Sequence, residues 1–130
     1  QQHYWQSRYS ISFPRLRPCA GGIEPASLMD ERQLVQTICA FRLLAPDVEL
    51  SLSTRESPWF RDRVVPLGIT SVSAFSKTQP GGYADNHPEL EQFAPHDGRR
   101  PEEVASALLR NGLQPVWKDW DSYLGRTDLR

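Results

Sequence analysis

Residues 48–56, Val-Glu-Leu-Ser-Leu-Ser-Thr-Arg-Glu, alternate strictly between two kinds of side chain. One face of an extended strand would carry Val48, Leu50, Leu52 and Thr54, and the other would carry Glu49, Ser51, Ser53 and Arg55. Ser57-Pro58 follows at once and is typical of a helix start. A strand that ends on an arginine directly before a helix is how α/β enzymes present a ligand-binding residue. For one isolated strand, a half-buried element with a solvated face is the more frequent explanation.

Two further segments, 9–16 and 69–77, show the same alternation, and a short last strand is predicted at 113–117. In each of the three alternating segments one face is rich in serine: Ser10 and Ser12, Ser51 and Ser53, and Ser71 and Ser73. Central strands of a doubly wound sheet are apolar on both faces, which these strands are not. Two explanations remain open, an exposed sheet face or a barrel whose small polar side chains line an interior that holds something polar.

Three helices are predicted between and after these strands. The first begins after the N-cap Asp30, and Gln33 is placed to complete a capping box. The second begins after Ser57 and carries Trp59 on its apolar side. The third runs from residue 101 to a C-cap at Gly112. Alternation of strands and helices predicts an α/β fold with a parallel sheet and right-handed crossovers.

All three predicted strands run into cationic residues: Arg15 and Arg17, then Arg55, then Lys77. The carboxyl ends of parallel strands lie on one rim of a sheet, so these charges would form an anion site there. An arginine fork suits a carboxylate best. The alternative is that the arginines are solvated or pair with Glu49 and Glu56.

Composition narrows the classes of function. With 130 residues, 38% hydrophobic and 24% charged, the chain is expected to be one soluble globular unit in the cytoplasm. The net charge of −1 gives no reason to expect nucleic acid or an anionic membrane surface as a partner. Cys19 and Cys39 form no metal-ligand spacing and no disulfide framework, and Cys39 is predicted to be a core residue.

Four segments carry a resemblance to a known family: SISFPRLRPC, LSLSTRES, SAFSKTQPGGY and PVWKDWDSYLGR. They closely resemble the C-terminal third of the bacterial 2-iminoacetate synthases, the tyrosine lyases of thiamine thiazole biosynthesis in the radical S-adenosylmethionine (SAM) superfamily. The resemblance runs over nearly the whole chain. Because the chain also starts at Gln1 without Met, as if a helix were already in progress, we expect a C-terminal fragment of a longer protein.

The resemblance implies a TIM-like (β/α)₈ barrel, with its last three strands and their helices in residues 1–82 and a C-terminal cap in 83–130. It implies a full-length enzyme that uses a [4Fe–4S] cluster and S-adenosylmethionine to cleave the Cα–Cβ bond of L-tyrosine. The products would be p-cresol and 2-iminoacetate (dehydroglycine), which passes to thiazole synthase. The family's cluster motif, CxxxCxxC, does not occur in this chain. We therefore expect this fragment to bind neither cofactor and to be inactive alone.

The resemblance also implies roles for site residues. Arg55 matches the arginine that pairs with the amino-acid carboxylate. Ser73, or its face-mate Ser71, matches a position that holds the polar end of the substrate, while Ser53 and Arg15 are weaker candidates for the same cavity. The histidines, His3, His87 and His96, are predicted surface residues. Two other functions stay open: a non-catalytic binding or scaffold domain derived from such a barrel, and a sister lyase, such as the hydrogenase-maturation tyrosine lyase or a tryptophan lyase.

Overall fold

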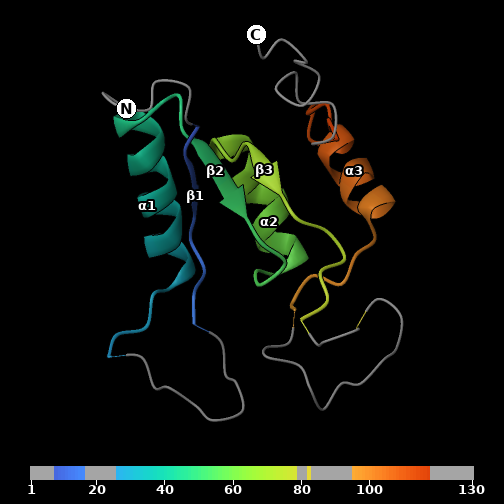
Figure 1. Ribbon diagram of the computed structural model, residues 1–130, viewed down its shortest axis with the longest axis horizontal. Coiled ribbons are helices and arrows are strands. Elements are labelled where there is room, and N and C mark those ends of the chain that lie inside the picture. The colour runs from blue at the N-terminus through green and yellow to red at the C-terminus, as the bar shows by residue number, and fades with distance from the viewer. Residues whose placement is uncertain (1–7, 17–25, 79–81, 83–94, 118–130) are drawn as a thin grey trace, which may run out of the picture.

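The computed structural model describes residues 8–16, 26–78, 82 and 95–117. Along the chain the elements are β1 (Ser10–Ser12), α1 (Glu31–Leu44), β2 (Glu49–Leu52), α2 (Pro58–Val64), the 3₁₀ helix η1 (Val65–Leu67), β3 (Ser71–Val72) and α3 (Pro101–Arg110). Figure 1 shows the strands side by side between α1 and α3, with α2 behind the sheet. The predictions for His3, Arg17, Cys19 and His87 lie outside the described residues.

The sheet is parallel throughout, with strand order β1-β2-β3. Ser12 is paired with Ser51, and Ser51 with Ser71. The main chain before β3 continues the pairing, since the Thr70 amide donates to the Leu50 carbonyl at 2.9 Å. The predicted α/β arrangement with a parallel sheet is confirmed for the part of the chain that the structure describes.

Helix α1 forms where its capping signal predicts it. The Gln33 amide donates to the Asp30 carboxylate at 2.7 Å, and the Asp30 amide donates to the Gln33 side chain at 2.9 Å. Leu34 and Ile38, one turn apart, are 0% exposed. Burying each of these side chains stabilises the fold by roughly 1.5–3 kcal/mol relative to leaving it in water. The capping box and the apolar stripe together fix which face of α1 meets the sheet.

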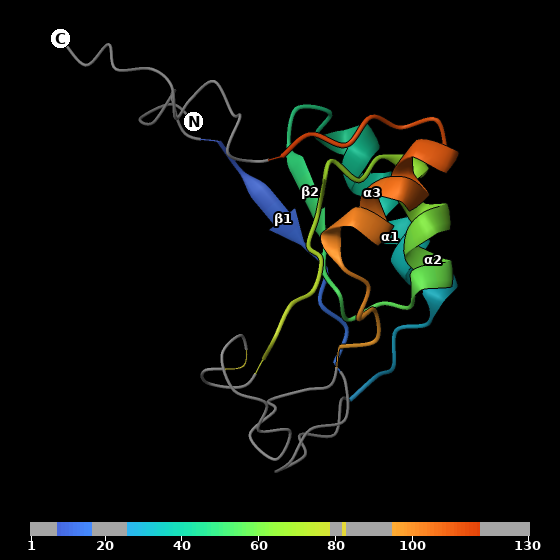
Figure 2. The same cartoon turned by 90° about the vertical axis from the view of Figure 1, so that its right-hand side faces the viewer.

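The hydrophobic core lies on one face of the sheet only. Figure 2 shows the three α-helices on the same side of the strands. The core cluster joins residues of that sheet face to residues of α1, α2 and η1: Leu34, Ile38, Leu50, Leu52, Phe60, Val64, Val65 and Ile69. Leu50 and Leu52 point into it, whereas Ser51 and Ser53 between and after them are half-buried. The alternation predicted for residues 48–56 is therefore confirmed.

The third helix is held at both ends by the predicted residues. Pro101 opens α3, and Gly112 follows its C-cap with a φ of 74°, a conformation that suits glycine. Val104 and Ala107 are buried, and Leu108 packs against the core cluster. Among the described residues, no helix has the length and apolarity needed to cross a membrane.

Three local predictions are wrong. The predicted strand 69–77 is shorter: β3 is Ser71–Val72, main-chain hydrogen bonds to β2 extend from Thr70 to Ser73 only, and Phe75 then adopts a φ of 53°. Trp59 is 59% exposed and stacks under the Arg63 guanidinium at 4.2 Å, so it is not on the apolar side of α2. Residues 113–117 form no strand, although Leu113 packs against the core.

Candidate functional site

The serine face of the sheet is the side opposite the helices. We use this name for Ser10, Ser12, Ser51, Ser53, Ser71 and Ser73. The strand register places Ser12, Ser51 and Ser71 in one row across the three strands. Ser53 and Ser73 each come one residue after the end of their strand, β2 and β3, toward the carboxyl rim. The face of the sheet that carries these serines is the one that no described helix covers (Figure 2).

Arg55 follows β2 with the same alternation as Ser51 and Ser53, and it is half-buried. Its amide donates to the Ser53 hydroxyl at 3.3 Å, and its Nη1 lies 3.5 Å from the main-chain carbonyl of Arg15. The end of β2 is thus in contact with the end of β1. Lys77 lies 5.2 Å from the Phe75 ring, beyond the end of β3. The structure places Arg55 at the same rim as the candidate serines Ser53 and Ser73.

Arg15 is not brought together with the serine face. It follows Ile11 and Phe13 in the alternation of β1, and both of these pack against the core cluster. Its Nε donates to the Glu56 carboxylate at 2.9 Å, a second nitrogen donates to the other carboxylate oxygen, and its guanidinium lies 5.7 Å from the Phe60 ring centre. The hydrogen bonds that Arg15 donates to Glu56 raise the pKa of Arg15 above its ordinary value. Arg15 therefore forms the ion pair with Glu56, which was the alternative to an anion site.

Ser73 has an unusual combination of contacts. Its amide donates to the Leu52 carbonyl at 3.3 Å, which continues the parallel pairing by one residue beyond β3. Its carbonyl accepts a hydrogen bond from the Arg61 guanidinium. Its hydroxyl is buried, with no hydrogen-bond partner among the described residues. A buried hydroxyl without a partner is rare in folded proteins, so this one is suited to meet a polar group of a ligand.

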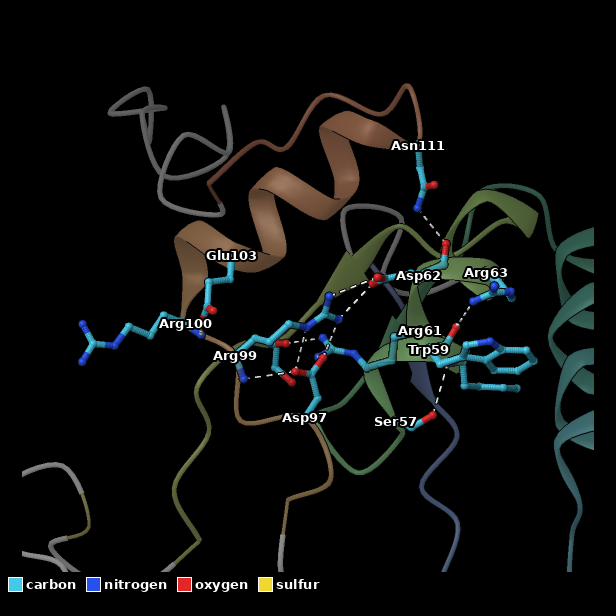
Figure 3. Close-up of polar contacts among 12 residues, drawn as sticks. Ser57, Trp59, Arg61, Asp62, Arg63, Asp97, Arg99, Arg100, Glu103 and Asn111 are labelled. Carbon is cyan, nitrogen blue, oxygen red and sulfur yellow. Dashed lines mark hydrogen bonds and ion pairs between the residues drawn. The ribbon is translucent and has the colours of Figure 1, made fainter.

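A charged network at the same rim was missed by the sequence reasoning. The Asp97 carboxylate, 0% exposed, accepts hydrogen bonds from Arg61 and Arg99 (Figure 3). Arg99 also bridges to Asp62 of α2 through two hydrogen bonds of 2.9 and 3.1 Å. The Asp97 amide donates to the Thr54 carbonyl at 3.0 Å, directly before Arg55. We call Arg61, Asp62, Asp97 and Arg99 the rim network.

The charges within the rim network compensate one another. Burial by itself raises the pKa of Asp97, but the hydrogen bonds from Arg99 and the charges of both arginines lower that pKa to below its ordinary value. Burial lowers the pKa of Arg61, and the hydrogen bonds that Arg99 donates to Asp97 and Asp62 raise the pKa of Arg99. Asp97 is therefore a carboxylate at neutral pH and holds two guanidiniums.

The described residues do not fit an iron–sulfur cluster. No three His, Cys, Asp or Glu side chains among them come close enough to hold a metal ion. Cys39 is half-buried and has no disulfide partner in the described part of the chain, and the sequence contains no CxxxCxxC motif. We therefore assign no cofactor chemistry to these residues.

Comparisons with known proteins agree with the fold. The sequence model of the Biotin and Thiamin Synthesis associated domain matches residues 12–114. The chain is 85% identical over all 130 residues to the 2-iminoacetate synthase of Escherichia coli (strain K12), of which it covers 34%. It is 83% identical over 126 residues to the 2-iminoacetate synthase of Salmonella typhimurium (strain LT2), of which it covers 33%. The chain thus spans about a third of the length of these curated relatives.

Two solved structures share the arrangement of the elements. One is HydG, described as a maturase of the [FeFe]-hydrogenase, with a TM-score of 0.80 and 32% identity over 96% of this chain and 28% of that chain. The other is the FeFe-hydrogenase maturase HydG from Carboxydothermus hydrogenoformans, with a TM-score of 0.70 and 28% identity over 81% of this chain and 24% of that chain. In both comparisons this chain corresponds to about a quarter of a larger protein.

Proposed function

Because this chain belongs to the Biotin and Thiamin Synthesis associated domain family, we propose that it is part of a radical S-adenosylmethionine lyase that cleaves the Cα–Cβ bond of L-tyrosine. The products are 2-iminoacetate (dehydroglycine) and p-cresol, and 2-iminoacetate supplies the thiazole ring of thiamine. The observation that carries this proposal is the 85% identity over all 130 residues to a 2-iminoacetate synthase.

In this proposal Arg55 binds the carboxylate of tyrosine. Its place at the carboxyl rim of a parallel sheet supports the role, because ligands of α/β enzymes bind at that rim. A guanidinium can donate two parallel hydrogen bonds to one carboxylate, which fixes the orientation of the amino acid as well as its charge. Arg15 is bound by Glu56 on the helix side of the sheet, so we do not propose it as the anchor.

The serines complete the polar end of the pocket. The buried Ser73 hydroxyl is the first candidate to meet the amino or carboxylate group of tyrosine, and Ser71 is its face-mate one pleat away. The Ser53 hydroxyl already accepts a hydrogen bond from the Arg55 amide, so it helps to shape the turn that presents Arg55. These side chains bind and orient substrate, and none of them is proposed as a catalytic residue.

The architecture we propose is the last three strands of a TIM-like (β/α)₈ barrel. The serine face would then line the barrel interior, and residues 83–130 would form the C-terminal cap after the strands in residues 1–82. Support comes from the parallel sheet, whose helices lie on one side only, and from the likeness to HydG at a TM-score of 0.80. The outer strands β1 and β3 would pair with the remainder of the barrel.

The [4Fe–4S] cluster and S-adenosylmethionine belong, in this proposal, to the part of the enzyme outside this chain. When bound there they supply the radical that initiates bond cleavage. Thiazole synthase is the proposed protein partner that receives 2-iminoacetate, and the cytoplasm is the proposed compartment.

The test is release of p-cresol from tyrosine by the full-length, reconstituted protein. Replacing Arg55 with alanine should raise the KM for tyrosine, because loss of a charge-assisted contact costs roughly 2–5 kcal/mol. The exposed Arg32 of α1, replaced in the same way, is the matched control and should leave KM unchanged. An unchanged KM in Arg55→Ala removes Arg55 from the pocket.

The same assay separates the other functions. A full-length protein that binds tyrosine but releases no p-cresol is a scaffold derived from such a barrel. Preferred turnover of tryptophan would indicate a sister lyase. The 85% identity to 2-iminoacetate synthases, against 32% to HydG, favours the thiamine enzyme over the hydrogenase maturase.

A further inference from the structure

Arg61 is a buried cation that reaches from a helix to the end of a strand. It lies on α2, and 2% of its surface is exposed. An arginine on such a short surface helix usually extends into water, because burying its charge is unfavourable unless the guanidinium is paired and hydrogen-bonded. Here the guanidinium donates to the Asp97 carboxylate and to the main-chain carbonyl of Ser73. The second contact links α2 to the candidate site.

The end of β3 has few other supports. Its ladder with β2 pairs Ser71 and Val72 only, followed by the single hydrogen bond from the Ser73 amide to the Leu52 carbonyl at 3.3 Å. Two residues later Phe75 adopts a positive φ of 53°. The peptide group between Ser73 and the next residue is therefore held by Arg61 rather than by sheet pairing. The direction of the Ser73 side chain depends on the position of this peptide group.

The rim network in turn fixes Arg61. Arg99 donates to Asp97 at 2.7 and 2.9 Å and bridges it to Asp62, one residue after Arg61 on α2 (Figure 3). The Asp97 amide is bound to the Thr54 carbonyl at 3.0 Å. The network thus connects the residue before Arg55 at the end of β2 with Ser73 at the end of β3. These are the two points from which the proposed site binds its ligand.

The buried Ser73 hydroxyl, without a partner among the described residues, indicates what this support is for. A hydroxyl that is held rigidly and left unpaired keeps its hydrogen-bonding capacity for a ligand. If the end of β3 were loose, the hydroxyl could rotate toward a main-chain group of its own strand. The contact from Arg61 to the Ser73 carbonyl holds the main chain from which this side chain extends.

We propose that Arg61 is a positioning residue for substrate binding, which holds the Ser73 hydroxyl toward the amino-acid ligand through the Ser73 main-chain carbonyl. This inference rests on the proposed function, because the ligand it names is the polar end of tyrosine. Arg61 itself does not touch the substrate. Its effect on tyrosine affinity passes through Ser73.

The experiment is a double-mutant cycle in the full-length, reconstituted enzyme. Ser73→Ala, Arg61→Lys and the double variant are compared for KM and kcat of p-cresol formation, with cluster content and melting temperature measured for each. We expect each single change to raise KM about tenfold, the loss of one hydrogen bond, with little change in kcat. Because Arg61 acts through Ser73, the double variant should match Ser73→Ala. Arg63→Lys, on the exposed side of the same helix, is the control and should leave KM unchanged.

Each outcome separates the inference from the proposed function. If the wild-type protein releases no p-cresol from tyrosine, both fall. If the wild type is active, but the KM increase in the double variant is the product of the two single increases, Arg61 does not act through Ser73. The inference is then overturned. An unchanged KM in Ser73→Ala overturns it as well, while the lyase activity stands. If Arg61→Lys does not fold, Asp97→Asn takes its place in the cycle, because it removes the charge that orients Arg61.

Discussion

The buried carboxylate of Glu56 accepts two hydrogen bonds from the guanidinium of Arg15, which lies 41 residues earlier in the chain. This pair joins the segment that follows β1 to the segment that precedes α2, and Arg15 also donates to the Met29 carbonyl at 3.2 Å, just before α1. A single ion pair therefore connects three segments at the carboxyl rim. It lies on the helix side of the sheet, behind the proposed site.

Replacing Glu56 with glutamine should destabilise the full-length protein. The amide keeps the shape but removes the charge that binds Arg15, which costs about 1–3 kcal/mol for a buried hydrogen-bonded group. Thermal melting measures the change, and the exposed Glu102, changed to glutamine, is the control. KM for tyrosine should stay unchanged in both. Equal melting temperatures for the two variants would show that the pair does not hold the rim together.

Gly68 should not tolerate a side chain. Its φ is 129°, and a Cβ there would lie 3.0 Å from Cγ of Arg42, whose guanidinium donates to the Gly68 carbonyl at 2.7 and 3.0 Å. Gly68→Ala should lower stability by about 1–3 kcal/mol through backbone strain. Gly98→Ala is the matched control, because nothing lies within 4 Å of its Cβ. Both should keep the KM for tyrosine, since Gly68 lies at the amino rim of the sheet. A neutral Gly68→Ala in thermal melting would contradict the account.

Acid should weaken the rim network. The folded-state pKa of Asp97 is lowered, because hydrogen bonds and charges from Arg99 and Arg61 outweigh the effect of burial. Its contribution to stability is therefore complete above the unfolded pKa, near 4, and is lost as pH falls through the lower folded value. Asp97→Asn removes this titration. The variant should melt at a lower temperature at neutral pH, but its melting temperature should fall less than the wild type's between about pH 5 and pH 3.

The control for this pH series is Asp47→Asn, at an exposed position between α1 and β2. It should follow the wild-type curve. If Asp97→Asn and the wild type lose stability in parallel on acidification, Asp97 does not contribute to the acid sensitivity of the fold.

Much of the fold was predictable because its signals are local. Strict alternation fixed the two faces of β2, and the Asp30–Gln33 box fixed the start of α1. Strand and helix order then required a parallel sheet, since a crossover helix separates each pair of strands. The serine face followed from the same alternation.

The contacts of the rim network were not predicted, because they join residues far apart in the sequence. Arg61 and Asp97 are separated by 36 residues, and Asp97 sits in a polar stretch without periodicity. The position of Glu56 held a usable signal: it continues the buried alternation of Leu50, Leu52 and Thr54, and a buried glutamate requires a cationic partner. Trp59 was misplaced because an aromatic side chain can also be exposed under a cation, here Arg63.

The central claim is that Arg55 binds the carboxylate of the substrate. A thermodynamic cycle that combines two proteins with two ligands tests this claim most directly. Calorimetry would measure the Kd of tyrosine and of tyramine, which lacks the carboxylate, for full-length wild-type protein and for Arg55→Ala. We predict that the wild type prefers tyrosine by about thirtyfold or more, and that the variant loses most of this preference, because the contact costs roughly 2 kcal/mol or more. The same preference for tyrosine over tyramine in both proteins would contradict the account.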